Sequence, residues 1–145
     1  MKRFWLAAVL LGLVIGCGKP TSPQSGEKSN DSSVPVPEKI RVAFVTNNAS
    51  DFWKIAEAGT KKAMAELGCE VLFRIPSKGT AEEQQSIVQD LIVTGVSGIA
   101  ISPKDPQNQT EMLNEAAAKV NLITQDSDAP ESNRICYIGT DNYAA

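Results

Sequence analysis

Short apolar runs alternate with helical patterns along the chain from about residue 40 onward. Runs rich in β-branched and aromatic residues predict strands, and apolar residues recurring every three or four positions predict helices. The expected strands span residues 40–46, 70–75, 98–102, 121–124 and 135–138, and the expected helices span residues 51–67, 81–94 and 106–119. Residues 125–134 are too few for an ordinary helix and predict a loop.

This alternation predicts an α/β fold built on a parallel sheet. The first and third runs are nearly continuous apolar segments, which is typical of strands covered by helices on both faces. We expect a doubly wound sheet with strand order 2-1-3-4-5 and its switch point between strands 1 and 3. The loops after strands 1, 3 and 4 then meet on one side of the sheet.

Local signals mark where the three helices begin and end. Thr80 and Glu83 have the spacing of a capping box, and Asp105 followed by a proline predicts a capped start for the third helix. Gly68 is a stop signal for the first helix. The apolar positions predict one stripe on the first helix (Ile55, Gly59, Ala63, Leu67) and a buried face on the second (Ile87, Val88, Leu91, Ile92).

The first 38 residues have a different composition. Lys2 and Arg3 precede a 13-residue apolar run that is shorter than the roughly 20 residues needed to span a bilayer. The run ends in LVIGC, which resembles a bacterial lipoprotein signal and implies removal of residues 1–16 and lipidation of Cys17; a plain secretory signal is the alternative. Residues 17–38 are rich in Ser, Pro and charged residues and predict a disordered tether.

Composition and charge exclude several classes of function. The net charge is −3 with no clustered Lys or Arg, so nucleic-acid binding is not expected. The chain has no histidine, which removes the commonest metal ligand and every His-dependent catalytic triad. The turn TNNASD after the first strand has no glycine, so we expect no dinucleotide cofactor there.

The chemistry predicted for the switch point suits a sugar. Asn47 and Asn48 follow the first strand and precede Phe52 and Trp53, while Asp126 follows the fourth strand. Amides and carboxylates can hydrogen-bond vicinal hydroxyls, and aromatic faces can cover the C–H faces of a sugar ring. The sequence therefore predicts a monosaccharide or related polyol as ligand.

Asp105 and Asp128 are secondary candidates for the same site. Asp105 is better explained as a helix cap, and Asp126 with Asp128 supplies too few carboxylates for a calcium site, so we expect no metal. A hydrolase that uses Asp126 and Asp128 would need a second positioned acid, which the sequence does not indicate. Receiver-type phosphotransfer would need an Asp at the end of strand 3, where Ser102 stands instead.

Several segments together resemble the ribose/galactose-type periplasmic sugar-binding proteins, the receptors of ABC sugar importers. These segments are VTNNASDFW, GTAEEQQSIVQDLIVTGVSGIAISPKDP, LITQDSDAP and YIGTDNYAA. The resemblance implies one lobe of a two-lobed type I periplasmic binding protein that does no covalent chemistry and delivers its ligand to an ABC permease. It implies sugar contacts by Asn48, Phe52, Trp53 and Asp126. With the lipid anchor it implies the periplasmic side of the cell envelope.

The sequence differs from that family at one residue and in its length, and each difference leads to a further expectation. Ser127 stands where ribose binders commonly have arginine, so the resemblance does not extend to ribose itself. Members of the family are about twice as long, and residues 39–142 correspond to their N-terminal lobe, with residues 143–145 resembling the start of the second. We therefore expect weak binding by this chain alone. The alternative function is a sensor lipoprotein that presents a sugar or signal molecule to a membrane receptor.

Overall fold

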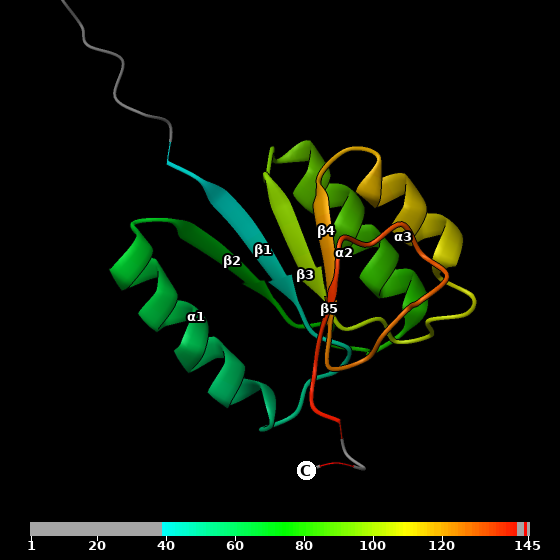
Figure 1. The fold of residues 1–145 in the computed structure, drawn as a ribbon, viewed down its shortest axis with the longest axis horizontal. Coiled ribbons are helices and arrows are strands. Elements are labelled where there is room, and N and C mark those ends of the chain that lie inside the picture. Colours follow the sequence, from blue (N-terminus) through cyan, green and yellow to red (C-terminus); the bar gives the residue numbers. More distant parts are fainter. Residues whose placement is uncertain (1–38, 142–143, 145) are drawn as a thin grey trace, which may run out of the picture. The chain divides into compact units, whose positions relative to one another are not determined.

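A computed structural model describes residues 39–141 and 144, which form a five-stranded sheet with three helices (Figure 1). The signal segment, Cys17 and the tether predicted for residues 1–38 lie outside the described residues, as do residues 142, 143 and 145. The strands are β1 (Arg41–Val45), β2 (Glu70–Arg74), β3 (Gly98–Ile101), β4 (Asn121–Gln125) and β5 (Tyr137–Ile138), and the helices are α1 (Trp53–Leu67), α2 (Ala81–Val93) and α3 (Thr110–Ala117).

The predicted topology is confirmed. The strand order is β2-β1-β3-β4-β5, and every neighbouring pair is parallel. All carboxyl ends therefore lie at one edge of the sheet, which is the lower edge in Figure 1. The chain reverses its direction of winding between β1 and β3, where open α/β sheets leave a crevice for ligands.

The main core lies between the sheet and the helices α2 and α3. Ala43 and Val45 of β1 pair with Ile99 and Ile101 of β3, and all four side chains are buried. Residues of α2, α3 and β4 complete this core (Val88, Leu91, Met112, Leu113, Ala116, Leu122). Val88 and Leu91 confirm the buried face predicted for the second helix.

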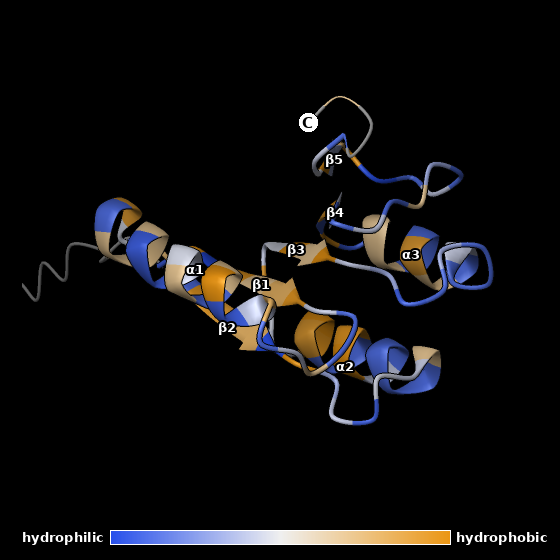
Figure 2. Ribbon diagram, turned by 90° about the horizontal axis from the view of Figure 1, so that it is seen from below, coloured by the Kyte–Doolittle hydropathy of each residue, from blue (hydrophilic) through white to orange (hydrophobic). Residues whose placement is uncertain are grey.

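Of the three described helices, only α1 lies on the opposite face of the sheet (Figure 2). Its backbone packs mainly against β2, at the edge of the sheet, while Trp53 at its start reaches Phe44 of β1. The stripe predicted for this helix does not form its contact surface, because Ile55 and Leu67 are 79% and 76% exposed. An apolar hollow of about 310 Å³ is left between α1 and the sheet, lined in part by Val42, Phe44 and Ile123.

The capping signal of α2 is confirmed and extended. Thr80 Oγ1 accepts a hydrogen bond from the backbone N–H of Glu83. The Glu83 carboxylate accepts three bonds from the backbone N–H groups of residues 77–79, at 2.7–3.1 Å. Desolvation opposes ionisation of Glu83, but a bond from the Ser77 hydroxyl at 2.8 Å and these backbone bonds outweigh it and lower its pKa. They also hold Gly79, whose φ of 61° favours glycine, against Asn47 and Asn48.

The helix α3 begins later than the sequence predicts. It starts at Thr110 rather than at residue 106, so Asp105 is not its N-cap. Residues 106–109 form a turn instead, and the Asp105 carboxylate accepts bonds from the backbone and side chain of Asn108. Gln109 folds back to accept a bond from the Asp105 N–H at 2.9 Å, which holds this turn outside the regular helix.

No helix among the described residues is both long enough and apolar enough to cross a membrane.

Candidate functional site

Three polar side chains converge where the loops after β1, β3 and β4 meet. Ser102 Oγ donates to Asp126 Oδ2 at 3.0 Å, and Asn47 Nδ2 donates to Ser102 Oγ at 3.0 Å and to Asp126 Oδ2 at 3.5 Å. Ser102 is fully buried, whereas Asp126 is exposed. Within the described residues Asp126 Oδ1 receives no hydrogen bond, so this oxygen is available to a ligand.

The backbone of Asp126 has an unusual conformation. Its φ is 61°, the one positive value among the non-glycine residues that the structure describes, and the Ser127 N–H bonds to Gln125 O across it at 2.7 Å. Aspartate tolerates this left-handed region better than most residues, but the conformation still stores strain. Such strain persists only where the surrounding structure imposes it, and it is concentrated at functional sites.

The segment of β5 holds Asp126 in this conformation. The Asp126 N–H donates to Ile138 O at 3.0 Å, and Tyr137 Oη donates to Asp126 O at 2.9 Å. A Cβ at Gly139 would collide with the phenol ring of Tyr137. A glycine at this position therefore allows Tyr137 to lie across the backbone and reach Asp126.

The two adjacent aromatic residues have different surroundings. Phe52 is 60% exposed, while Trp53 is 2% exposed. Trp53 packs edge-on against Phe44 and Phe52, with ring centroids 6.1 and 4.9 Å apart, and its indole N–H donates to Asn48 Oδ1 at 3.3 Å. Trp53 thus supports Asn48 from beneath, and Phe52 is the aromatic that faces outward. Asn48 Nδ2 has no partner within the described residues and can donate to a ligand.

A hollow of about 300 Å³ opens beside this cluster. It is lined by Phe52 and Asp126, by the last residues of β4 and β5, and by the two residues that follow β5 (Gln125, Ile138, Gly139, Thr140). An exposed aromatic face and a free carboxylate oxygen border the same space. That pairing can recognise a ligand that has both hydroxyl groups and apolar C–H faces.

Asp105 and Asp128 lie apart from Asp126, on a different hollow of about 440 Å³. The Asp128 carboxylate pairs with Arg134 at 2.5 and 2.8 Å and accepts a bond from Thr124 Oγ1 at 2.7 Å. The hydrogen bond from Arg134 is the main cause that lowers the pKa of Asp128 to about 2. Hydrogen bonds from Asn108 likewise lower the pKa of Asp105. Both carboxylates therefore make their hydrogen bonds within their own loops rather than with the cluster around Asp126.

Residues that the sequence did not single out hold the site together. Ser102 and Tyr137 contact Asp126, and the buried amide of Gln84 lies behind the loops after β1 and β3. Gln84 was detectable in principle, because it occupies the same helical stripe as Ile87, Val88 and Leu91. A polar residue in an otherwise apolar stripe indicates a buried side chain that makes hydrogen bonds within the protein.

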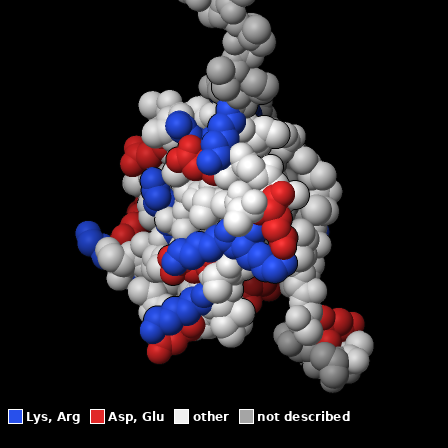
Figure 3. Space-filling model, turned by 90° about the vertical axis from the view of Figure 1, so that its left-hand side faces the viewer, with Lys and Arg blue, Asp and Glu red and all other residues white. Residues whose placement is uncertain are grey.

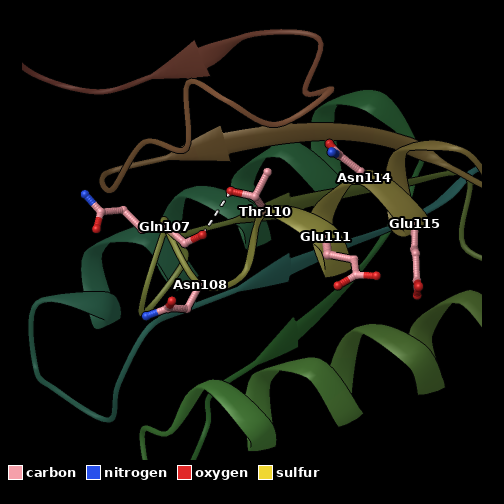
Figure 4. Close-up of a pocket in the computed structure, with 6 residues that line it drawn as sticks. All are labelled: Gln107, Asn108, Thr110, Glu111, Asn114 and Glu115. Atoms are coloured by element: carbon pink, nitrogen blue, oxygen red, sulfur yellow. Dashed lines mark hydrogen bonds between the residues drawn. The ribbon is translucent and has the colours of Figure 1, made fainter.

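Another hollow lies on the outer side of α3 and contains none of the residues singled out from the sequence (Figure 4). Its lining side chains point in different directions, and the dashed line marks the local bond from Thr110 Oγ1 to Gln107 O at 3.2 Å. Asn114 already accepts a bond from the Asn133 N–H. These side chains do not converge on a common point.

The charges on the face that carries α1 are mixed (Figure 3). Three ion pairs along this helix join oppositely charged neighbours at 2.6–2.8 Å (Lys54–Asp51, Lys61–Glu57, Lys62–Glu66). Such exposed pairs contribute little stability, and the described residues on this face form no single-sign patch (Figure 3). In the part of the chain that the structure describes, no group of three His, Cys, Asp or Glu residues could hold a metal ion.

The comparisons with known proteins agree with this fold. Residues 42–145 match the periplasmic binding protein domain family. An ABC transporter solute-binding protein from Burkholderia graminis, solved with D-arabinose, is similar with 33% identity and a TM-score of 0.68, over 72% of this chain and 37% of that protein. AraP, an arabinose-binding protein from Geobacillus stearothermophilus, is similar with 28% identity and a TM-score of 0.67, over 73% of this chain and 37% of AraP.

A third similar structure contains a partner protein. A chain of the XylFII-LytSN complex shares 29% identity with a TM-score of 0.68, over 74% of this chain and 40% of that chain. This chain thus spans well under half the length of each of these solved relatives. Because the family match covers most of the sequence, the chain belongs to the periplasmic binding protein family, and the part described here is a single lobe like those of the sugar-binding members that serve ABC transporters.

Proposed function

We propose that the loops after β1, β3 and β4 form one wall of a monosaccharide site in the substrate-binding component of an ABC sugar importer. The observation that carries the proposal is the hollow that Phe52 and Asp126 share at the carboxyl edge of the sheet. Members of the family are binding proteins rather than enzymes, and the proposed role requires no cofactor and no bond to be broken. The proposed ligand is a pentose, a hexose or a related polyol.

Each residue of the wall has a distinct proposed role. Asp126 accepts from ligand hydroxyls through Oδ1, Asn48 donates through Nδ2, and Phe52 covers a C–H face of the ring. Trp53 acts through Asn48, which it supports from the buried side. Asn47 acts on Asp126 through Ser102, to which it donates at 3.0 Å, and by a longer bond of 3.5 Å to Asp126 itself. Charge-assisted bonds of the kind that Asp126 offers are worth about 1.5–3 kcal/mol each once water is excluded.

The proposed location is the periplasmic side of the cell envelope, with lipidated Cys17 tethering the domain to a membrane. There it would present its sugar to the ABC permease. The similarity to a chain of the XylFII-LytSN complex supports a second candidate, a sensor lipoprotein that passes its ligand state to another protein. The two candidates share the sugar site and differ only in the partner.

A titration followed residue by residue tests the site. ¹⁵N-labelled chain starting at residue 17 is titrated with D-arabinose, D-xylose, D-glucose and D-galactose, and amide shifts are mapped by NMR. We expect one sugar to shift Asn48, Phe52 and Asp126 with about millimolar affinity, near −4 kcal/mol, because a single wall supplies only part of the contacts. Shifts confined to the outer side of α3, or none with any sugar, would refute the proposal.

A further inference from the structure

Gln84 is a polar side chain at the centre of the fold. It is 0% exposed and lies on the face of α2 that otherwise contributes Val88 and Leu91 to the core. A carboxamide can donate two hydrogen bonds and accept two. Gln84 makes all four, with donor–acceptor distances between 2.7 and 3.0 Å. Its position is therefore determined by polar contacts rather than by apolar packing alone.

The two bonds that Gln84 donates join the strands on either side of the switch point. The Ser102 N–H donates to Val45 O at 2.9 Å, and among the described residues this is the last backbone bond between β1 and β3. Just beyond it, Gln84 Nε2 donates to Thr46 O at 2.9 Å and to Ser102 O at 2.7 Å. The side chain thus continues the connection between the two strands where their backbone ladder stops.

The two carbonyl groups that Gln84 holds belong to residues that support the candidate site. Thr46 Oγ1 donates to Asn48 O at 3.0 Å, and Ser102 Oγ donates to Asp126 Oδ2 at 3.0 Å. Hydrogen bonds therefore connect Gln84 to Asn48 through Thr46 and to Asp126 through Ser102. Both side chains belong to the proposed sugar site, and each has a hydrogen-bonding atom without a partner among the described residues.

The two bonds that Gln84 accepts fix it to the loop after β3. Gln84 Oε1 accepts from the Lys104 N–H and from Gln109 Nε2, each at 3.0 Å. Gln109 in turn accepts from the Asp105 N–H at 2.9 Å. The carboxamide cannot turn over without placing its NH₂ group against these two donors, so its orientation is fixed.

We propose that Gln84 is a positioning residue of the candidate site, which sets the separation of Asn48 from Asp126 by bridging the backbone carbonyls of Thr46 and Ser102. It does not touch the ligand itself. The proposal rests on the proposed function only where ligand affinity is measured, because the local connection between the loops can be measured without a sugar.

The test compares Gln84→Met with Gln85→Met, which changes the neighbouring exposed glutamine of the same helix. Methionine keeps the length of the side chain and removes its hydrogen bonds. We expect Gln84→Met to speed hydrogen exchange at the Lys104 amide about tenfold or more and to shift the Asn47 side-chain amide resonances. The Gly68 amide, bonded to Met64 O at the end of α1, serves as the distant reference and keeps its exchange rate.

Sugar affinity is the second measurement. Where the parent chain binds a sugar, Gln84→Met weakens binding about tenfold and Gln85→Met leaves it unchanged. An equal rise in exchange at Lys104 and Gly68 would mean a general loss of stability, and that result would overturn the proposal. Unchanged exchange at Lys104, or local change with unaltered affinity, would overturn it as well.

Two further measurements distinguish failure of the proposed role of Gln84 from misfolding of the variant and from failure of the proposed function. If Gln84→Met does not fold, Gln109→Met removes one of the four bonds to Gln84 and is expected to give the same local pattern at smaller amplitude; exchange at Lys104 equal to that of the parent would overturn the proposal. If the parent chain binds no sugar of the panel, the proposed function fails on its own. The exchange rates and the Asn47 resonances then still decide whether Gln84 connects the two loops.

Discussion

Replacing Asp128 by asparagine removes the negative partner of Arg134 while keeping the shape of the side chain. The carboxylate accepts two bonds from Arg134, one from Thr124 Oγ1 and one from the Ala129 N–H, and about a quarter of each charged side chain is exposed. These contacts stabilise the loop between β4 and β5, the same loop that begins with Asp126.

The pKa of Asp128 sets the size of the effect. It lies at about 2 in the folded chain against an ordinary value of 3.8, and each pKa unit corresponds to about 1.4 kcal/mol. The ionised carboxylate therefore contributes about 2 kcal/mol to the free energy of unfolding at neutral pH. For a domain of about 100 residues this corresponds to roughly 10 °C in Tm.

The sign of the pH dependence follows from the lowered pKa. The contribution is complete above pH 3.8, where Asp128 is ionised in both states, and it is lost as the pH falls toward 2. The Tm difference between the parent chain and Asp128→Asn should thus be near 10 °C at pH 7 and shrink markedly by pH 2.5. Circular dichroism melts across this range measure it.

The matched control for this experiment is Glu131→Gln, which neutralises an exposed carboxylate of the same loop. We expect its Tm to stay within about 2 °C of the parent at every pH, because exposed charges contribute little. An Asp128→Asn difference that is below 2 °C at pH 7, or that does not depend on pH, would show that the Arg134 pair does not stabilise this loop.

The remaining predictions concern the site and two glycines. Asp126→Asn keeps a residue that tolerates positive φ, so Tm should change little while sugar affinity falls at least tenfold; unaltered affinity by NMR titration would contradict the role of Asp126. Phe52→Ala should change the free energy of unfolding by no more than about 0.5 kcal/mol and still weaken sugar binding, and a stability loss without an affinity loss would contradict its role. Gly139→Ala should lower the free energy of unfolding by about 1–3 kcal/mol because the added Cβ meets Tyr137. Gly59→Ala should raise it by about 0.5–1 kcal/mol because nothing lies near that Cβ. Urea unfolding measures both changes, and equal effects would contradict this interpretation of the two glycines.

The topology of this lobe was predictable because its signals are local. Apolar runs, the Thr80–Glu83 cap and the stop at Gly68 each depend on a few neighbouring residues, and they specified the strand order correctly. The order in turn brings Asn47, Asn48 and Asp126 to the same edge of the sheet.

The details that the sequence did not predict depend on contacts between distant segments. Ser102 reaches Asp126 across 24 residues and Asn47 across 55, and no local pattern encodes those pairs. Burial of Trp53 depends on its contact with Phe44 of β1 and on its bond to Asn48. The late start of α3 results from the Gln109 side chain, which bonds back to Asp105 and to Gln84.

The part of the sheet beside α1 that no described residue covers affects how this chain can be assayed. The hollow beside Val42, Phe44 and Ile123 is apolar and open, and Ile55 and Leu67 lie exposed on the neighbouring helix. Environment-sensitive dyes partition onto surfaces of this kind in the native state. A dye-based melting curve of this chain should therefore start with high fluorescence and show a small transition. The intrinsic emission of Trp53, the one tryptophan after residue 16, reports unfolding without that background.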